Sequence, residues 1–299
     1  MTPMDIILDC DPGIDDALAL ALAVATPELN LCAVTCVAGN RPVETTARNA
    51  RALLDLFGAP DIPVYAGAPG PLDNATAQFN LVHGEDGLGG VDIDRSGIVA
   101  DGHGADVLAE ALLSEARAKL TVVATGPLTN LALAETRHPG ILARARAVLV
   151  MGGAMYCPGN VTAAAEFNFY ADAGAAGIVA RSGAALQIFP LDVTRDAAMT
   201  PDWLRRLASQ ETRSMQALTA MLRAYGAQDP LLHDVCPVAA LIAPTLFSGE
   251  TGCLKIESGS PCIEGRCWFH PGRSSTKVYF ETQQEHLLEV IAERLMALP

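Results

Sequence analysis

The stretch that decides the fold runs from residue 6 to residue 16 and reads Ile-Ile-Leu-Asp-Cys-Asp-Pro-Gly-Ile-Asp-Asp. Its apolar start predicts a buried strand, the Pro12-Gly13 pair predicts a turn, and the alanine- and leucine-rich segment that follows predicts a helix. This order gathers four carboxylates at the carboxyl end of one strand, those of Asp9, Asp11, Asp15 and Asp16. Two carboxylates about 4 Å apart repel by about 4 kcal/mol at an effective dielectric constant of about 20. The cluster therefore calls for a compensating charge, and a bound cation is the simplest one.

Helix capping is the alternative explanation, because Asp is favoured at the N-cap and in the first turn of a helix. Capping accounts for Asp15 or Asp16, but not for Asp9 and Asp11, which precede the turn. The ligands on offer are oxygens with no Cys/His pair beside them, which favours Ca²⁺ or Mg²⁺ over zinc. Cys10 faces away from its Asp neighbours on a strand, so we assign it to the core.

Composition indicates one large domain, residues 1–299, because a chain of 299 residues with 50% hydrophobic residues and a mean hydropathy of +0.26 can bury a large core. The formal net charge of −14 and the pI of about 4.7 argue against nucleic acid or a membrane surface as a partner and favour a small ligand. The start of the chain shows no basic, cleavable leader, so we expect a cytoplasmic location. The longest apolar stretch, residues 17–25, is too short to span a bilayer. We expect the eight scattered cysteines to be reduced core residues.

Apolar, β-branched runs alternate with alanine-rich helical ones along most of the chain. The runs predict strands at residues 6–8, 31–38, 62–65, 120–124, 147–151 and 186–193, and helices at residues 15–25, 43–57, 105–118 and 201–225. This alternation predicts an α/β fold, an open and mostly parallel central sheet with helices on both faces. From residue 252 the pattern changes to a small β-hairpin region and a final helix at residues 284–298. Residues 67–104 form the loosest segment, the kind that builds functional loops.

Polar residues follow several predicted strands, and in an open parallel sheet ligands bind beyond the carboxyl ends of the strands. The candidates are Asn40, Thr125, Asn160, Glu166, Asn168 and the pair His233-Asp234, which precedes an apolar helix at residues 235–242. Each also has a structural explanation. Asn40 could cap the next helix, and Thr125 could belong to an ordinary turn with Thr129 as the cap. His233-Asp234 could be an N-cap pair, although a His beside an Asp is also a way to place a proton donor next to a ligand carboxylate.

A glycine-rich loop, Gly-Glu-Asp-Gly-Leu-Gly-Gly at residues 84–90, follows His83. It resembles a phosphate cradle at first sight, but it lacks the Lys-Ser/Thr end of a P-loop and contains two acidic residues that would repel phosphate. We therefore predict a flexible loop that borders the pocket and brings His83 to the substrate.

Taken together, these motifs resemble those of the inosine-uridine-preferring nucleoside hydrolases, and the match covers nearly the whole chain. The resemblance rests on five segments in order, residues 9–16, 37–40, 125–130, 166–168 and 233–234. It implies a ribonucleoside N-ribohydrolase that releases free base and ribose, as in purine and pyrimidine salvage, and that forms a homodimer or homotetramer.

The resemblance also implies a role for each matching position. A Ca²⁺ ion would be held by Asp11, Asp16, the backbone carbonyl of Thr125 and Asp234, with Asp11 as the general base that deprotonates a calcium-bound water. The ribose would be gripped by Asp15, Asn40, Asn160, Glu166 and Asn168, and Phe167 would pack near the sugar. His233 would protonate a purine leaving group, and Asp9 would support the loop structurally.

Base preference is where the chain departs from the pattern of the family that it resembles. Members that favour pyrimidines are expected to use a Tyr and a Gln on the helix before the His-Asp pair. Here Tyr225 precedes His233 by eight positions, but Met221 stands one turn earlier, where Gln is expected. Tyr225 is open to two interpretations, contact with the base or a place in the helix core.

Two other functions remain to be weighed. One is a magnesium-dependent aspartyl phosphatase that uses Asp9 and Asp11, against which the acidic Asp15 and Asp16 and the lack of basic residues near the strand ends both argue. The other is a non-catalytic protein that binds nucleosides through calcium, which the presence of both a presumed base and a presumed acid opposes.

Overall fold

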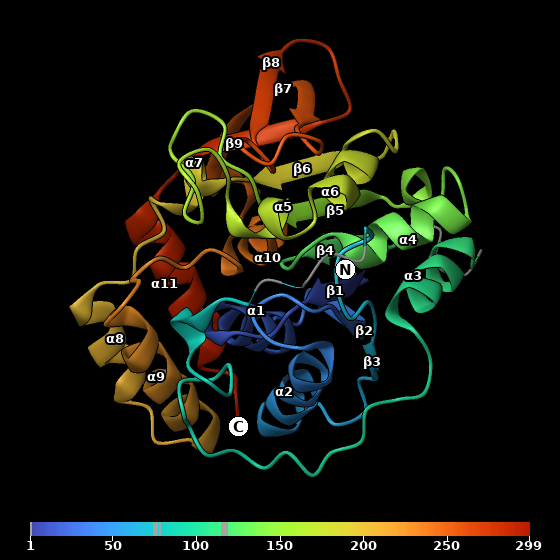
Figure 1. The fold of residues 1–299 in the computed structure, drawn as a ribbon. Helices are drawn as coiled ribbons and strands as arrows, with labels where there is room; N and C mark the ends of the chain where they lie inside the picture. The colour runs from blue at the N-terminus through green and yellow to red at the C-terminus, as the bar shows by residue number, and fades with distance from the viewer. Residues whose placement is uncertain (1, 74–76, 78, 115–118) are drawn as a thin grey trace.

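The computed structural model describes residues 2–73, 77, 79–114 and 119–299. A nine-stranded sheet in the order β3-β2-β1-β4-β5-β6-β9-β7-β8 runs through the centre (Figure 1). The first seven strands in this order pair in parallel, and β7 pairs antiparallel with both β9 and β8. The strands are β1 Met4–Cys10, β2 Leu29–Cys36, β3 Val64–Ala66, β4 Thr121–Ala124, β5 Ala147–Met151, β6 Leu186–Phe189, β7 Phe247–Ile256, β8 Cys267–Pro271 and β9 Lys277–Thr282.

Helices cover both faces of the sheet, which confirms the predicted α/β architecture (Figure 1). One face carries α1 Ile14–Ala25, α2 Val43–Leu56, α8 Pro201–Ala208, α9 Arg213–Gly226, α10 Val235–Ile242 and α11 Gln284–Leu295. The other face carries α3 Gly104–Leu113, α4 Thr129–Arg137 and α6 Ala173–Ala180. The short helices are η1 Leu81–His83, η3 Leu142–Arg144, α5 Phe167–Ala171, α7 Leu191–Thr194 and η4 Pro244–Leu246.

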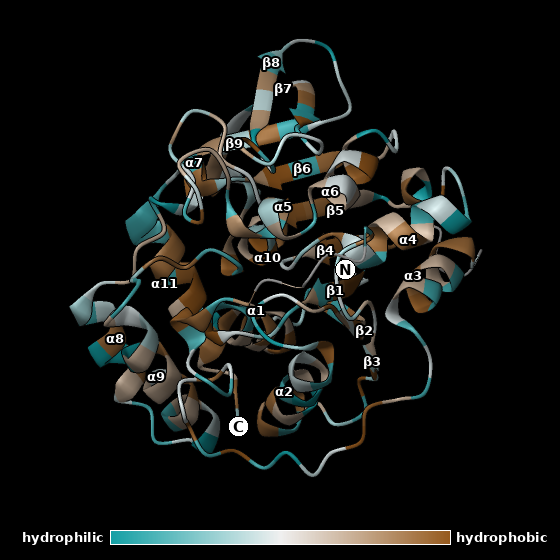
Figure 2. Cartoon of the chain, viewed as in Figure 1, coloured by the Kyte–Doolittle hydropathy of each residue, from teal (hydrophilic) through white to brown (hydrophobic). Residues whose placement is uncertain are grey.

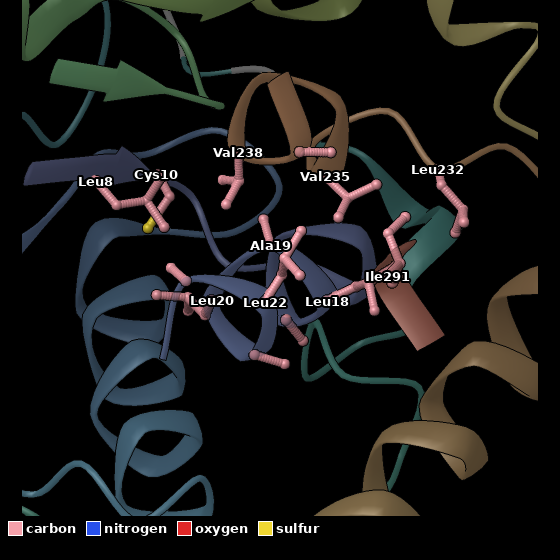
Figure 3. Packing of buried hydrophobic residues seen from close by; sticks show 14 of the residues in the cluster. Leu8, Cys10, Leu18, Ala19, Leu20, Leu22, Leu232, Val235, Val238 and Ile291 are labelled. Carbon is pink, nitrogen blue, oxygen red and sulfur yellow. The ribbon is translucent and has the colours of Figure 1, made fainter. Parts of the chain in front are cut away.

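The core lies between the sheet and these two helical layers. The central strands are mainly hydrophobic in Figure 2, whereas hydrophilic residues lie along outer helices such as α2 and α8. Helix α1 is buried almost all round, and Figure 3 shows Val235 and Val238 of α10 facing it. Cys10 is fully buried in the same cluster, as its place on the strand predicted. None of the helices in the described residues is long and apolar enough to cross a membrane.

Alternation along β1 separates Asp9 from the rest of the acidic stretch. Leu8 and Cys10 belong to the α1 side of the core, while Asp9 points to the opposite side. There Asp9 Oδ1 accepts hydrogen bonds from Thr35 Oγ1 (2.5 Å) and Asn130 Nδ2 (2.8 Å), and burial raises the pKa of Asp9 to about 7. Asp9 thereby ties β1 to β2 and to α4, a structural contact of the predicted kind.

Several predicted boundaries were wrong, each for a local reason. The strand predicted at residues 186–193 ends at Phe189, because Pro190 precedes the short helix α7. The single helix predicted at residues 201–225 is two helices, since Thr212 caps the start of α9 with its side chain. The C-terminal β-region begins at Phe247 rather than at residue 252. The helix predicted at residues 105–118 runs from Gly104 to Leu113, and residues 115–118 lie outside the described residues.

No disulfide joins the cysteines in the described part of the chain, and the expectation that they belong to the core is only partly confirmed. Cys10, Cys36, Cys236 and Cys267 are buried, whereas Cys253 and Cys262 are exposed. The exposed pair lies in and beside the C-terminal antiparallel strands, where one face of the sheet meets solvent.

Candidate active site

A pocket of about 280 Å³ opens beyond the carboxyl ends of the parallel strands, where the sequence predicted a ligand site. Twelve of the predicted site residues line it, and they come from loops and helix ends spread along the chain: Asp11, Asp15, Asn40, His83, Thr125, Asn160, Glu166, Phe167, Asn168, Tyr225, His233 and Asp234. The thirteenth, Asp16, is fully buried behind these side chains. The fold therefore brings the whole predicted set to one place.

Three carboxylates meet at the floor of the pocket. Asp15 and Asp16 lie in the first turn of α1 and Asp234 lies at the start of α10, and one oxygen from each falls within 4.8 Å of the other two. Gly13 N donates to Asp16 Oδ2 (2.9 Å), so Asp16 closes the first turn of the helix while its other oxygen accepts from Thr125 Oγ1 (2.7 Å). In the described structure the Asp234 side chain makes no capping hydrogen bond to α10. Capping therefore explains part of the role of Asp16 but none of the role of Asp234.

The electrostatics of this cluster fit a cation. Burial, reinforced by Asp15, raises the pKa of Asp16 to about 7, and burial together with Asp15 and Asp16 raises the pKa of Asp234 well above its usual value. The buried Oδ1 of Asp15 lacks a hydrogen-bond partner among the described residues. No lysine or arginine occurs among the described residues that line the pocket. Three ionised carboxylates can share this space only with a positive ion between them, and an all-oxygen donor set suits a hard divalent cation.

Asp11 stands apart from this group of three, although the resemblance placed it among the metal ligands. Its Oδ2 accepts a hydrogen bond from the backbone N of Asn40 (2.6 Å). A Cβ atom at Gly126 would lie 2.5 Å from Asp11 Oδ1, and one at Gly39 would overlap Oδ2, so only glycine fits at either position. Burial, and then Asp16, raises the pKa of Asp11 well above its usual value. Asp11 is thus a pocket-lining carboxylate whose place depends on two glycines from the loops after β2 and β4.

The predicted ribose contacts are held rigidly by backbone groups. Glu166 is the N-cap of α5, where its Oε1 accepts from Asn168 N (2.7 Å) and its Oε2 accepts from Gly153 N (2.8 Å). Asn168 Nδ2 donates to the carbonyl of Thr125 (2.7 Å), and Asn160 Oδ1 accepts from Phe167 N (2.9 Å). Burial raises the pKa of Glu166. These side chains are fixed before any ligand arrives, which lowers the ordering cost of binding.

Asn40 does not cap α2, because the N-cap of that helix is Pro42. Its amide instead donates to the carbonyl of Asp11 (3.1 Å) and to Asp16 Oδ2 (3.4 Å), which links the loop after β2 to the acidic turn. The second capping alternative is also wrong, since Thr129 Oγ1 donates to Asp172 rather than capping α4. Both residues therefore serve contacts between distant segments.

One wall of the pocket is formed by a stacked pair of rings. The His83 and Tyr225 rings lie 5.2 Å apart with an interplanar angle of 14°, and Tyr225 is buried in the core while also lining the pocket. His83 Nδ1 accepts from Ile14 N (3.1 Å), which leaves Nε2 3.7 Å from Asp15 Oδ1. Burial lowers the pKa of His83, so its ring is neutral at pH 7. Met221, which stands where the pyrimidine pattern expects Gln, is fully buried and does not line the pocket. It therefore lies behind the stacked rings and not on the pocket surface.

His233 lies on the adjoining wall between two partners. Thr194 Oγ1 and His233 Nδ1 are 2.7 Å apart, and His233 Nε2 is 3.6 Å from Asp229 Oδ2. Thr194, which contacts His233 from behind the pocket lining, escaped the sequence analysis. Seven residues of the lining escaped it as well: Phe79, Asn80, Leu81, Val82, Met151, Val161 and Asp229. Met151 could have been found as the last residue of a predicted strand. The others carry no local signal, because the path of the chain through loops and short helices brings them to the site.

Comparisons with known proteins agree with this geometry. Residues 6–293 match the family model for inosine-uridine preferring nucleoside hydrolases. The chain is 36% identical to a pyrimidine-specific ribonucleoside hydrolase, RihA, of Klebsiella pneumoniae, with 98% of each protein covered. It is 38% identical to an uncharacterised protein of Schizosaccharomyces pombe, over 99% of this chain and all of that one.

Solved structures show the same likeness. A purine-preferring ribonucleoside hydrolase from Gardnerella vaginalis superposes with a TM-score of 0.91 at 29% identity, covering 97% of this chain and 98% of the other. The chain therefore belongs to the family of inosine-uridine preferring nucleoside hydrolases and is a nucleoside hydrolase.

Proposed function

We propose that this protein hydrolyses the N-glycosidic bond of ribonucleosides such as inosine and uridine, in a calcium-dependent reaction that releases free base and ribose. The observation that carries the proposal is the meeting of three buried carboxylates with Asp11 at the floor of a pocket whose wall is lined by histidine and tyrosine rings. A nucleoside has the matching parts, a polar sugar for the floor and a flat base for the wall.

Calcium fits the floor because the donors are carboxylate and carbonyl oxygens that lack a counter-charge. Asp16 and Asp234 would hold it, with Asp15 beside them and with Asp11 and the Thr125 carbonyl as the further ligands that the resemblance implies. When bound at this site, calcium would supply a water whose pKa is lowered.

Asp11 is the proposed general base. In the reaction, a water loses a proton to the Asp11 carboxylate, its oxygen bonds to the anomeric carbon of ribose, and the bond from that carbon to the base nitrogen breaks. The anomeric carbon of the sugar bears positive charge in this transition state, so the carboxylates around the pocket floor stabilise the transition state.

The fixed amides and Glu166 are proposed to orient the ribose. Asn40, Asn160, Glu166 and Asn168 all line the pocket and carry oxygens and amide groups of the kind that bind sugar hydroxyls. Phe167 also lines the pocket and would pack against the sugar ring. Such positioning holds the anomeric carbon near the attacking water, which is worth several orders of magnitude in rate.

His233 is the proposed acid for the leaving base, because it lines the pocket together with the stacked rings of His83 and Tyr225. It would give its proton to a ring nitrogen of a departing purine as the glycosidic bond breaks. The relatives named above include a pyrimidine-specific and a purine-preferring enzyme, so both base classes belong to the proposal.

One experiment separates this function from its alternatives. Purified protein is incubated with inosine and with uridine, with calcium and with a chelator, and the release of free base and ribose is followed. Calcium-dependent release of base supports the proposal, whereas binding without turnover would favour a nucleoside-binding protein. Cleavage of sugar phosphates without cleavage of nucleosides would favour the phosphatase, which the absence of lysine and arginine from the described pocket lining opposes. The oligomeric state, proposed to be a homodimer or homotetramer, can be measured on the same sample by light scattering.

A further inference from the structure

The Asn160 loop, residues 155–165, brings Asn160 to the pocket, where it is a proposed contact of the ribose. The second half of this loop is closed by its own bonds and contacts. Asn160 Oδ1 accepts from Phe167 N (2.9 Å), and a Cβ atom at Gly159 would overlap the backbone of Ala165. Asn160 itself is exposed, so burial in the core does not fix its position. Its place in the pocket therefore depends on how the rest of the loop is held.

The first half of the Asn160 loop is bonded to α7 and to the residue that follows this helix. Asp192 accepts hydrogen bonds from two consecutive backbone amides, Met155 N to Oδ2 and Tyr156 N to Oδ1 (both 2.8 Å). Arg195 donates from its guanidinium to the carbonyl of Pro158 (2.7 Å). Side chains at two positions thus hold three backbone groups of the loop just before Asn160.

Helix α7 is a rigid support for these bonds, because it is bonded to the core. Leu191 is buried, and its backbone N donates to the carbonyl of Gly153 (2.9 Å), just after β5. At the other end of the helix, Thr194 Oγ1 lies 2.7 Å from His233 Nδ1. The helix therefore contacts two parts of the pocket lining, the Asn160 loop and His233.

A carboxylate suits the position of Asp192, because it offers two acceptor oxygens and no donor. Hydrogen bonds to an ionised acceptor are about twice as strong as bonds between neutral groups. Met155 N and Tyr156 N each meet a separate oxygen, so the pair of bonds fixes both the position and the direction of the chain on its way to Asn160.

We propose that Asp192 is a positioning residue for substrate binding, which places Asn160 against the ribose by holding the start of the Asn160 loop on α7. The proposal rests on the proposed function, because that function makes Asn160 a contact of the sugar. Among the described residues, Asp192 lies outside the pocket lining, so it acts through the loop and not on the substrate.

The test uses Asp192→Asn, which keeps the size and shape of the side chain. An amide has a single acceptor oxygen, so one of the two backbone N–H groups would face an NH₂ donor and lose its partner. We expect kcat/KM for inosine to fall by about tenfold, the loss that corresponds to one hydrogen bond to a charged group.

A double-mutant cycle with Asn160→Ala separates this role from a general loss of structure. Where Asn160 is already alanine, the position of the loop no longer matters to the sugar. In that background Asp192→Asn should therefore lower kcat/KM by less than about twofold. Asp196→Asn is the matched control, because it removes a carboxylate from an exposed residue that follows the same helix, and it should leave kcat/KM unchanged.

The calcium-dependent rise in melting temperature gives a readout that does not depend on turnover. Asp192 lies outside the group of carboxylates proposed to hold the cation, so Asp192→Asn should show the same rise as the wild type. Loss of this rise in Asp192→Asn would show that the substitution acts on the whole site rather than on the Asn160 loop, and would overturn the inference.

Two kinetic results would also overturn the inference while leaving the proposed function intact. One is near-normal kcat/KM in Asp192→Asn, and the other is a set of losses in Asp192→Asn and Asn160→Ala that multiply in the double variant. Wild-type protein that releases no base from inosine would overturn the proposed function, and this inference with it.

Discussion

At the scale of single residues, the site depends on carboxylates that are buried before any ligand binds. Asp11 is buried, and its carboxylate lies close to Gly39 and Gly126. Asp16 accepts hydrogen bonds both from Gly13 N, at the start of α1, and from the Thr125 hydroxyl. Burial favours the protonated form of each group, as their raised pKa values show. The chemistry of the site therefore depends on the charge that neutralises these groups.

Asp11→Ala should reduce kcat with inosine and uridine by roughly two to four orders of magnitude, the usual effect of losing a general base. Alanine removes the carboxylate and leaves a small cavity between Gly39 and Gly126, so the fold should persist. Steady-state kinetics with saturating calcium provide the measurement, and the exposed Asp61→Ala provides the control. A variant with near-normal turnover would remove Asp11 from the mechanism.

His233→Ala should lower kcat with inosine more than with uridine. A uracil anion spreads its charge over two carbonyl oxygens and leaves with less help, whereas a departing purine depends more on protonation. The ratio of kcat for the two substrates, compared between wild type and variant, measures the effect. Equal losses would count against a role for His233 as a base-specific acid.

At the scale of elements, the glycine-rich loop of residues 84–90 holds His83 in the pocket wall. Asp86 organises this loop, because its Oδ1 accepts from Leu88 N and Gly90 N (both 3.0 Å) and its Oδ2 pairs with Arg95 (2.9 Å). Asn49 of α2 donates to the carbonyl of Asp86 (2.9 Å) and to that of Pro12 (3.4 Å). The loop, α2 and the acidic turn are thus linked by one set of hydrogen bonds.

Asp86→Ala should raise KM for inosine by about fivefold, which corresponds to about 1 kcal/mol of lost binding, while kcat changes less. The physical reason is that the loop loses its internal bonds and His83 loses its fixed position against Tyr225. Glu85→Ala is the matched control, because this neighbouring acidic residue is exposed. A fall in kcat with an unchanged KM would contradict the proposed positioning role of the loop.

At the scale of the whole molecule, the sheet joins residues that are far apart in the chain. The acidic turn after β1 and Asp234 at the start of α10 are more than 200 positions apart, yet their carboxylates meet at one point. Helix α10 packs on α1, so the two halves of the proposed cation site are held by the main core (Figure 3). Binding of a cation should therefore stabilise the entire fold.

Calcium should raise the melting temperature more at pH 8 than at pH 5. The pKa of Asp16 is about 7 in the folded protein against a usual 3.8, so between these values the folded state binds more protons than the unfolded state. The contribution of Asp16 to the free energy of unfolding of the metal-free protein is therefore complete below about pH 4, and it is lost as the pH rises toward 7. Calcium favours the ionised form and removes this loss at high pH, while at pH 5 it must displace protons.

Differential scanning fluorimetry with and without calcium at the two pH values, at constant ionic strength, measures this difference. Asp16→Asn should abolish most of the calcium-dependent shift, and sodium chloride of equal ionic strength should not reproduce it. A calcium shift that is the same at both pH values, or larger at pH 5, would contradict the assignment of these carboxylates to a cation.

Much of the architecture could be predicted from the sequence, because strand and helix periods are local properties of the chain. The buried strand at residues 6–8, the helix that follows the acidic stretch and the alternation of strands and helices are confirmed by the sheet and its two helical layers. The order of the motifs along the sequence also identified the predicted site residues, and the fold brings these residues together around one pocket. Their catalytic roles stay predictions.

Other features were decided only by the tertiary structure. The presence of Asp15 rather than Asp11 in the tight group of carboxylates, the burial of Met221 behind the wall, and the approach of Asp229 and Thr194 to His233 are not encoded in any local pattern. Which side chains meet across the sheet depends on strand order and on the path of each loop, and these follow from the packing of the entire core. The sequence thus determined the elements and the kinds of groups available, while the folded chain decided which of those groups face one another.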